Sequence, residues 1–196
     1  MAADREPLRK LLALYREGKI DEEDLLSRLL PEGERTEDPS AHGSNRARIA
    51  ELLDAYRAAE QSGAETLRAW ADRSTDVELR GGLRVIAGRE AAHAEVLAQR
   101  VRELGREPRA EIPGWLARYN ATLLEEGRSD ADRLGSIVAR FPDVSAATAG
   151  LRAVIEQMTD DPLSREVLRT IADDEELTLR WFHGAHARRT RSSESQ

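Results

Sequence analysis

The chain has 196 residues, of which 40% are hydrophobic and 34% charged, and its formal net charge is -7. This length suits one well-packed domain with a small appendage and is too short for two full-sized domains. Acidic and basic residues are interspersed without a basic face, so nucleic acid is not an expected partner. The chain has no cysteine, so any metal must be held by oxygen and imidazole donors.

The first 31 residues predict a two-helix appendage. Residues 6–31 carry two apolar helical stripes separated by Gly18, and they resemble the short helical hairpins that serve as terminal oligomerisation modules. The resemblance implies a homo-oligomer or a protein partner that binds through residues 6–31. The alternative is a hairpin that packs on the main domain. Residues 32–44 are polar with proline and glycine and predict a linker.

The N-terminus is charged from its first residues and lacks the apolar core of a signal peptide. No apolar run approaches membrane-spanning length. We therefore expect a cytoplasmic protein with no membrane partner.

Residues 45–188 form the main domain and predict an all-α fold, because apolar residues recur in steps of three and four and runs of β-branched residues are absent. The polar tail, residues 189–196, is expected to be disordered. Six helices are expected, ended by glycine and proline, at Asn45–Arg73, Asp76–Gly105, Gly114–Glu126, Ser129–Phe141, Asp143–Thr159 and Pro162–Ala187.

An internal repeat relates the second long helix to the last one. Residues 74–90 align with residues 159–175 at a constant offset of 85, which matches Asp76 with Asp161 and Glu90 with Glu175. These helices are therefore predicted to be equivalent parts of two helical hairpins. The long connection between the hairpins is typical of a four-helix bundle with one crossover.

Four side chains of types that can bind a metal fall on apolar helical stripes. Burying a carboxylate or an imidazole there without a partner would cost on the order of several kcal/mol of desolvation. Glu90 and His93 lie on one face of the second long helix. Glu60 and Glu175 lie near the middle of the first and last helices. All four are predicted at about the same level of an antiparallel bundle, where they would form a metal site.

The segments 60–67, 83–97 and 168–176 resemble the ferritin-like superfamily, and most closely its rubrerythrin-like branch. The resemblance spans about residues 45–187. It implies an antiparallel four-helix bundle with one lone glutamate on each of two helices and Glu-x-x-His on each of the other two. On this pattern Glu60 is the first lone glutamate, and Glu90 with His93 is the first Glu-x-x-His.

The second hairpin departs from that family pattern. Glu175 matches, but Thr178 stands at the position of the second histidine, and the repeat places Ser145 where the second lone glutamate belongs. Asp143 is the nearest carboxylate, although it follows Pro142 at the start of its helix. Three carboxylates and one imidazole suit a single iron, manganese or zinc ion. Two ions would need water, Asp143 or an exogenous bridge.

Two functions follow as hypotheses. In the first, the protein binds iron, or manganese or zinc, without an organic cofactor, and the ligands are Glu60, Glu90, His93 and Glu175. It then handles iron or acts as an oxidoreductase of the ferritin or rubrerythrin type, with oxygen or peroxide as the reactant. Tyr56, one turn from Glu60, is then an outer-sphere donor or, more simply, a core residue. In the second, the site is degenerate and the bundle is a scaffold or oligomeric adaptor.

Overall fold

The computed structural model describes the backbone of residues 39–194 and the side chains of residues 45–191. The predicted appendage, residues 1–31, lies outside the described residues, as do residues 32–38 and 195–196. The described part is all-α, as predicted, and has no strand. Its helices, in chain order, are α3 (Pro39–Arg73), α4 (Val77–Glu103), α5 (Gly114–Leu123), α6 (Asp130–Arg140), α7 (Val144–Gln157) and α8 (Pro162–Glu194).

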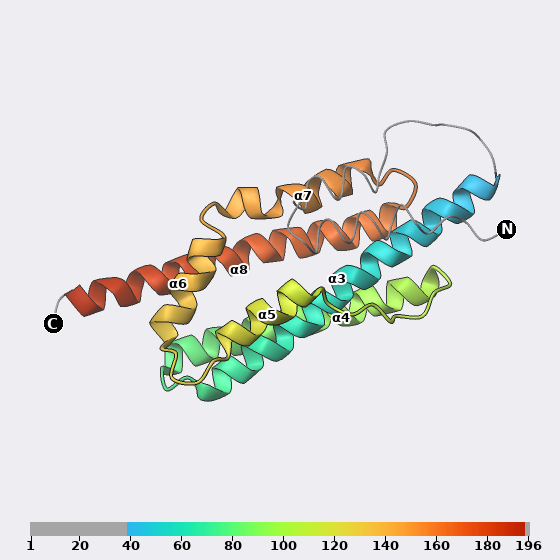
Figure 1. Cartoon of the computed structure of the whole chain (residues 1–196). Coiled ribbons are helices and arrows are strands. Elements are labelled where there is room, and N and C mark those ends of the chain that lie inside the picture. The colour runs from blue at the N-terminus through green and yellow to red at the C-terminus, as the bar shows by residue number, and fades with distance from the viewer. Residues whose placement is uncertain (1–38, 195–196) are drawn as a thin grey trace.

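The four helices α3, α4, α7 and α8 form two antiparallel hairpins, as Figure 1 shows. The crossover between the hairpins carries the two shorter helices. In Figure 1, α5 follows the first hairpin and α6 leads from it to the start of α7. Among the described helices, none has a stretch both long and apolar enough to span a bilayer.

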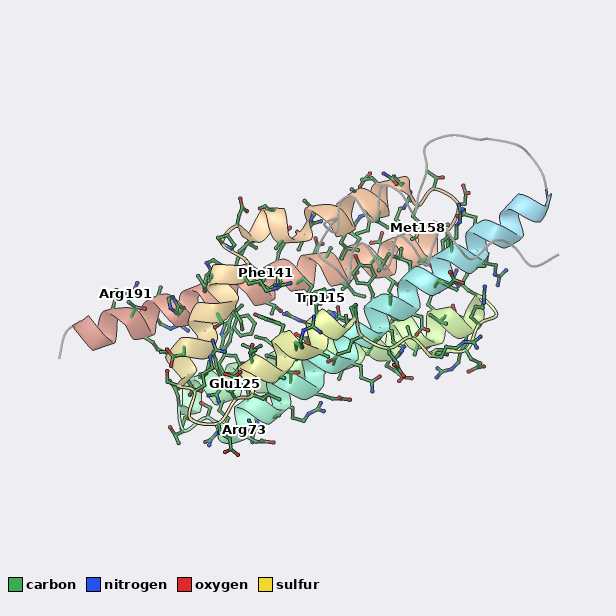
Figure 2. All side chains as sticks on the ribbon, viewed as in Figure 1. Arg73, Trp115, Glu125, Phe141, Met158 and Arg191 are labelled. Carbon is green, nitrogen blue, oxygen red and sulfur yellow. The ribbon has the colours of Figure 1, made fainter. Side chains whose placement is uncertain are left out.

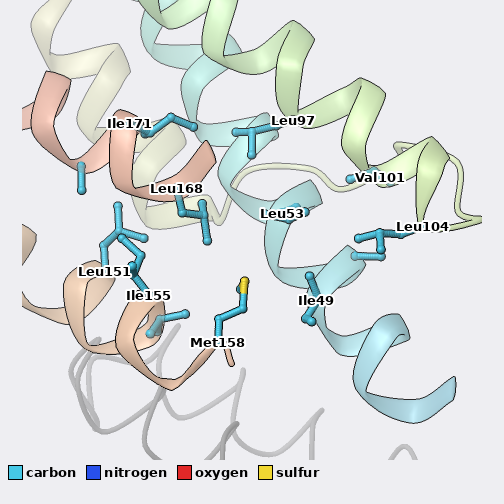
Figure 3. Packing of buried hydrophobic residues seen from close by; sticks show 13 residues of the cluster. Ile49, Leu53, Leu97, Val101, Leu104, Leu151, Ile155, Met158, Leu168 and Ile171 are labelled. Carbon is cyan, nitrogen blue, oxygen red and sulfur yellow. The ribbon is translucent and has the colours of Figure 1, made fainter. Parts of the chain in front are cut away.

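Two separate apolar clusters form the core. The first contains Ile49 and Leu53 of α3, Leu97 and Val101 of α4, and residues of α7 and α8 (Figure 3). The second contains Leu67, Trp70, Leu79, Leu83, Leu134, Leu179 and Phe182. On each of α3, α4 and α8 the two clusters are separated by the segment that holds a predicted metal ligand. The polar groups therefore occupy a layer between two apolar ones.

The predicted helix boundaries agree with the structure to within a few residues, except at the start of α3 and the end of α8. Helix α3 begins at Pro39 rather than Asn45, so part of the predicted linker is helical. Proline is well suited to the first turn of a helix because its missing N–H has no acceptor there. Helix α8 continues to Glu194, so most of the tail predicted to be disordered is helical. Arg188 and Arg189 hold this end by ion pairs to Glu78 and Asp76.

The predicted repeat has a structural counterpart at the starts of α4 and α8. The Asp76 side chain accepts a hydrogen bond from the N–H of Leu79 at 2.9 Å, and Asp161 accepts one from the N–H of Ser164 at 3.0 Å. These pairs are related by the repeat offset. Each aspartate caps its helix and is also bound by an arginine from the other hairpin, Arg189 for Asp76 and Arg100 for Asp161.

The crossover is held by contacts with α3 and by contacts between its own helices. At its start, the buried Asp54 of α3 accepts hydrogen bonds from the backbone N–H groups of Arg109 and Ala110, at 2.8 and 2.7 Å. Farther along, the Arg140 guanidinium lies 4.9 Å from the ring centroids of Trp115 and Tyr119, which joins α6 to α5 by cation–π contact. Figure 2 labels Trp115 near the start of α5.

Candidate metal centre

Three of the four predicted ligands converge in the layer between the apolar clusters. Glu60 of α3, His93 of α4 and Glu175 of α8 each offer a donor atom, and these atoms lie within 4.8 Å of one another. Glu60 and His93 are both buried, at 8% exposure. Three helices thus bring two carboxylates and an imidazole to one point inside the bundle, as the apolar stripes predicted.

The imidazole of His93 is fixed from both sides. Its Nδ1 lies 3.1 Å from Oε2 of Glu60, and its Nε2 lies 3.0 Å from Oδ2 of Asp174. Burial lowers the pKa of His93, but the hydrogen bonds and charges of Glu60 and Asp174 outweigh it and raise the pKa above its usual value. A carboxylate on one ring nitrogen is the arrangement that orients a metal-binding histidine toward its ion with the other.

Asp174 is a residue that sequence reasoning missed. Two adjacent acidic residues on a helix are ordinarily expected on a solvated face, but the side chain of Asp174 turns toward His93 and is only 26% exposed. Asp173 is exposed and pairs with Arg152 instead. The only signal in the sequence was that Asp174 directly precedes Glu175. Its partner comes from another helix, so its role depends on packing.

Glu175 carries an unsatisfied polar atom. Its Oε1 is buried and has no hydrogen-bond partner within the described residues. Burial, followed by the negative charge of Glu60, raises the pKa of Glu175 to about 8, although His93 and Arg89 act in the opposite direction. A carboxylate oxygen that is buried without a donor needs either a proton or a cation.

Glu90 lies beside this group but is not one of the three residues whose donor atoms converge. Its pKa is raised well above the usual value by burial and then by the charges of Glu175 and Glu60. The carboxylate occupies space left by Gly63 on the facing helix. A Cβ added at Gly63 would lie only 2.2 Å from Oε2 of Glu90. The absence of a side chain at Gly63 therefore makes room for Glu90 in the bundle.

A cavity of about 130 Å³ adjoins Glu90 and Glu175 on the side of the crossover. Its lining includes Tyr119 from α5 and Ile137 from α6. The Tyr119 hydroxyl is buried and has no partner within the described residues, and burial raises its pKa. The carboxylates thus face a small space with mostly apolar walls, whereas Asp174 lies on the Nε2 side of His93.

The remaining residues of the predicted pattern do not join the centre. Asp143 caps α7 by accepting hydrogen bonds from the N–H groups of Ser145 and Ala146, and the side chain of Ser145 is exposed. Tyr56 packs against the first apolar cluster, and its role as an outer-sphere donor stays a prediction. Thr178, at the position of the second histidine, is buried and accepts a hydrogen bond from Arg89.

The donors present fit a hard or borderline divalent cation. Carboxylate oxygens and an imidazole nitrogen are the ligands that iron, manganese and zinc accept. The unpartnered oxygen of Glu175 and the space that Gly63 leaves for Glu90 both suit a bound ion.

Comparisons with known proteins give one structural similarity. No protein-family model matches the chain, and no curated protein matches it. The structure is similar to the X-ray structure of the bacterioferritin of Desulfovibrio desulfuricans, with a TM-score of 0.59 and 22% sequence identity over 74% of this chain and 81% of that one. That bacterioferritin has a diiron site, which was observed in different catalytic states. At this level of identity the similarity establishes the fold, and the chain is a ferritin-like four-helix bundle.

Proposed function

We propose that this protein binds iron through Glu60, Glu90, His93 and Glu175 and takes part in iron handling or in reactions of oxygen or peroxide. The observation that carries the proposal is the convergence of donor atoms from Glu60, His93 and Glu175 within 4.8 Å inside the bundle. The diiron site of the similar bacterioferritin supports iron over manganese and zinc. Membership of the rubrerythrin-like branch and assembly into homo-oligomers belong to the same proposal.

The four ligands and Asp174 would have different roles in binding the ion. When bound, the iron would supply the redox and Lewis-acid chemistry. Glu60, Glu90 and Glu175 would balance its charge, and His93 would contribute a neutral nitrogen held in place by Asp174. Because Glu90 and Glu175 have raised pKa values, binding would release protons and would strengthen as the pH rises.

The direct test is the metal content of the tag-free full-length protein after loading with Fe(II), Mn(II) or Zn(II) and desalting. We expect at least one equivalent per chain from the wild type and less than about a tenth of that from His93→Ala, because outer-sphere changes alone already cost roughly 10- to 100-fold in metal affinity. Glu166→Ala on the exposed face of α8 is the matched control and should keep its metal. A wild type that retains no metal under any loading would overturn the proposal.

Redox activity needs a separate measurement. If the bound iron is redox-active, Fe(II)-loaded protein mixed with peroxide should develop a new optical band and consume the peroxide. Metal retention without either signal would leave a binding protein and exclude the oxidoreductase.

One observation favours the second candidate, a metal-free scaffold or adaptor. His93 already satisfies both ring nitrogens with Glu60 and Asp174, and the raised pKa values allow Glu90 and Glu175 to be protonated. In that case replacing Glu90 and His93 together with leucine should leave the melting temperature unchanged or higher, since buried polar groups are often replaced by apolar ones without loss. If the protein binds metal, the same variant should lose the stabilisation that a bound ligand confers.

Gly63→Ala separates metal binding from folding. Alanine is favoured over glycine inside a helix by about 1 kcal/mol, and the atom that its Cβ meets belongs to the end of a flexible side chain. We expect the fold to persist while the carboxylate of Glu90 is displaced and Fe(II) affinity falls by roughly 10-fold or more. Titration with Fe(II) and thermal unfolding of the metal-free variant measure the two effects. Unchanged affinity in a folded variant would show that Glu90 is not a ligand.

A further inference from the structure

Arg89 reaches the part of the centre where the family pattern places its second histidine. Its Nη2 donates a hydrogen bond to the hydroxyl of Thr178, which stands at that histidine position, and another to the carbonyl oxygen of Asp174 at 3.0 Å. Its Nη1 lies 3.4 Å from Oδ1 of Asp174. The guanidinium of α4 is therefore held on α8, next to Glu175, by three contacts.

The positive charge of Arg89 acts on the carboxylates of the centre. It lowers the pKa values of Glu90 and Glu175, opposing the effect of burial on both. Its Nε is buried and has no hydrogen-bond partner within the described residues. A fixed cation of this kind favours ionised carboxylates and repels a second cation placed near them.

A second ion would also find few ligands of its own. On α7, the buried Thr148 donates its hydroxyl hydrogen bond to Oε1 of Glu176 at 3.0 Å, and Asp143 is engaged in capping the helix. On α8, Thr178 already accepts from Arg89. The carboxylate of Asp174 is engaged by His93 and Arg89. Among the described residues around the centre, this leaves Glu90 and Glu175 for a second ion, and the first ion would share both of them.

We propose that Arg89, held by Thr178 and Asp174, occupies the second metal position, so that the centre takes a single divalent ion. This inference rests on the proposed metal binding by Glu60, Glu90, His93 and Glu175. It differs from a centre that has only lost ligands, because here a guanidinium supplies the charge at the position that would otherwise take the second ion.

The test uses Mn(II) as the probe with the full-length protein. Equilibrium dialysis followed by elemental analysis gives the ions per chain, and electron paramagnetic resonance distinguishes an isolated Mn(II) from an exchange-coupled pair. We expect one ion and an isolated-ion spectrum for the wild type. Thr178→His alone should still bind one ion, because Arg89 remains. Arg89→Gln combined with Thr178→His should bind more than one and approach two, with an exchange-coupled spectrum.

Arg84→Gln is the control, because Arg84 lies on the same helix and its ion pair with Asp72 is exposed. This variant should bind one ion. Two ions on the wild type would overturn the inference while leaving the proposed metal binding intact. A folded double variant that still binds one ion would overturn it as well. No ion on the wild type would instead refute the proposed function on which the inference rests.

Discussion

Metal-free protein should lose stability as the pH rises from about 5 to about 8, and Glu175→Gln should remove most of this loss. The pKa of Glu175 is raised from 4.5 to about 8 by burial and by the charge of Glu60. Between these values the folded protein binds more protons than the unfolded chain, so the free energy of unfolding decreases with rising pH. One pKa unit corresponds to about 1.4 kcal/mol, so this shift corresponds to an effect on the order of 5 kcal/mol for this group.

Two neighbouring groups act in the same direction. His93 has a raised pKa, so the stability that its charged form contributes is present at low pH and is lost as the pH rises through its pKa in the folded protein. Glu90 has a raised pKa for the same reason as Glu175. The wild-type protein should therefore lose more stability than Glu175 alone accounts for, and Glu175→Gln should retain a smaller dependence on pH.

Denaturant unfolding of chelator-treated protein at several pH values measures this dependence. Glu175→Gln should match the wild type near pH 4.5 and exceed it clearly at pH 8. Glu166→Gln, an exposed position on the same helix, should follow the wild-type curve. If the wild-type and Glu175→Gln curves ran parallel across the whole range, Glu175 would not be protonated inside the bundle. Adding Fe(II) at pH 8 should restore wild-type stability, because the ion replaces the missing proton.

The second large effect is a loss of stability, and it is expected when alanine replaces Gly82. Gly82 of α4 packs against the indole of Trp181 on α8. A Cβ added at Gly82 would lie 1.9 Å from Cζ2 of that ring. The indole is rigid and meets Phe182 edge to face, with their ring centroids 5.3 Å apart. Gly82→Ala should therefore separate the two helices and lower the free energy of unfolding by about 3 kcal/mol.

The adjacent glycine provides the comparison. An added Cβ at Gly81 meets nothing within 4 Å, and its position is exposed. Gly81→Ala should raise the free energy of unfolding by up to about 1 kcal/mol, through helix propensity alone. Thermal or denaturant unfolding of the two variants should give changes of opposite sign. Equal stabilisation by both substitutions would show that Trp181 does not pack against α4.

Apolar periodicity was enough to predict the six helices of the main domain and the level at which Glu60, His93 and Glu175 meet. It worked because a charged residue on an otherwise apolar stripe can only face the interior, whatever the arrangement of the other helices. Asp174 and Arg89 could not be predicted in this way. Each lies beside a stripe, and the direction of its side chain is decided by a partner on a different helix.

The outer ends of α3 and α8 were missed for a related reason. Residues 39–44 and 188–194 are mostly polar in sequence, so no apolar period marks them as helical. The end of α8 is held by arginine pairs to the start of α4, and such contacts between distant segments leave no regular pattern in the sequence. Terminal boundaries are therefore the part of this fold that sequence reasoning describes least well.

The cavity beside Glu90 and Glu175 bears on how fast ions or small molecules could reach the centre. Its outer wall comes from α5, α6 and the start of the following turn, which belong to the crossover. If the centre binds an ion, the packed helices α3, α4 and α8 would set its affinity. We expect local opening of the crossover, without unfolding of the bundle, to set the rate at which ions or small reactants enter and leave. Exchange rates and affinities should therefore respond to different sets of substitutions.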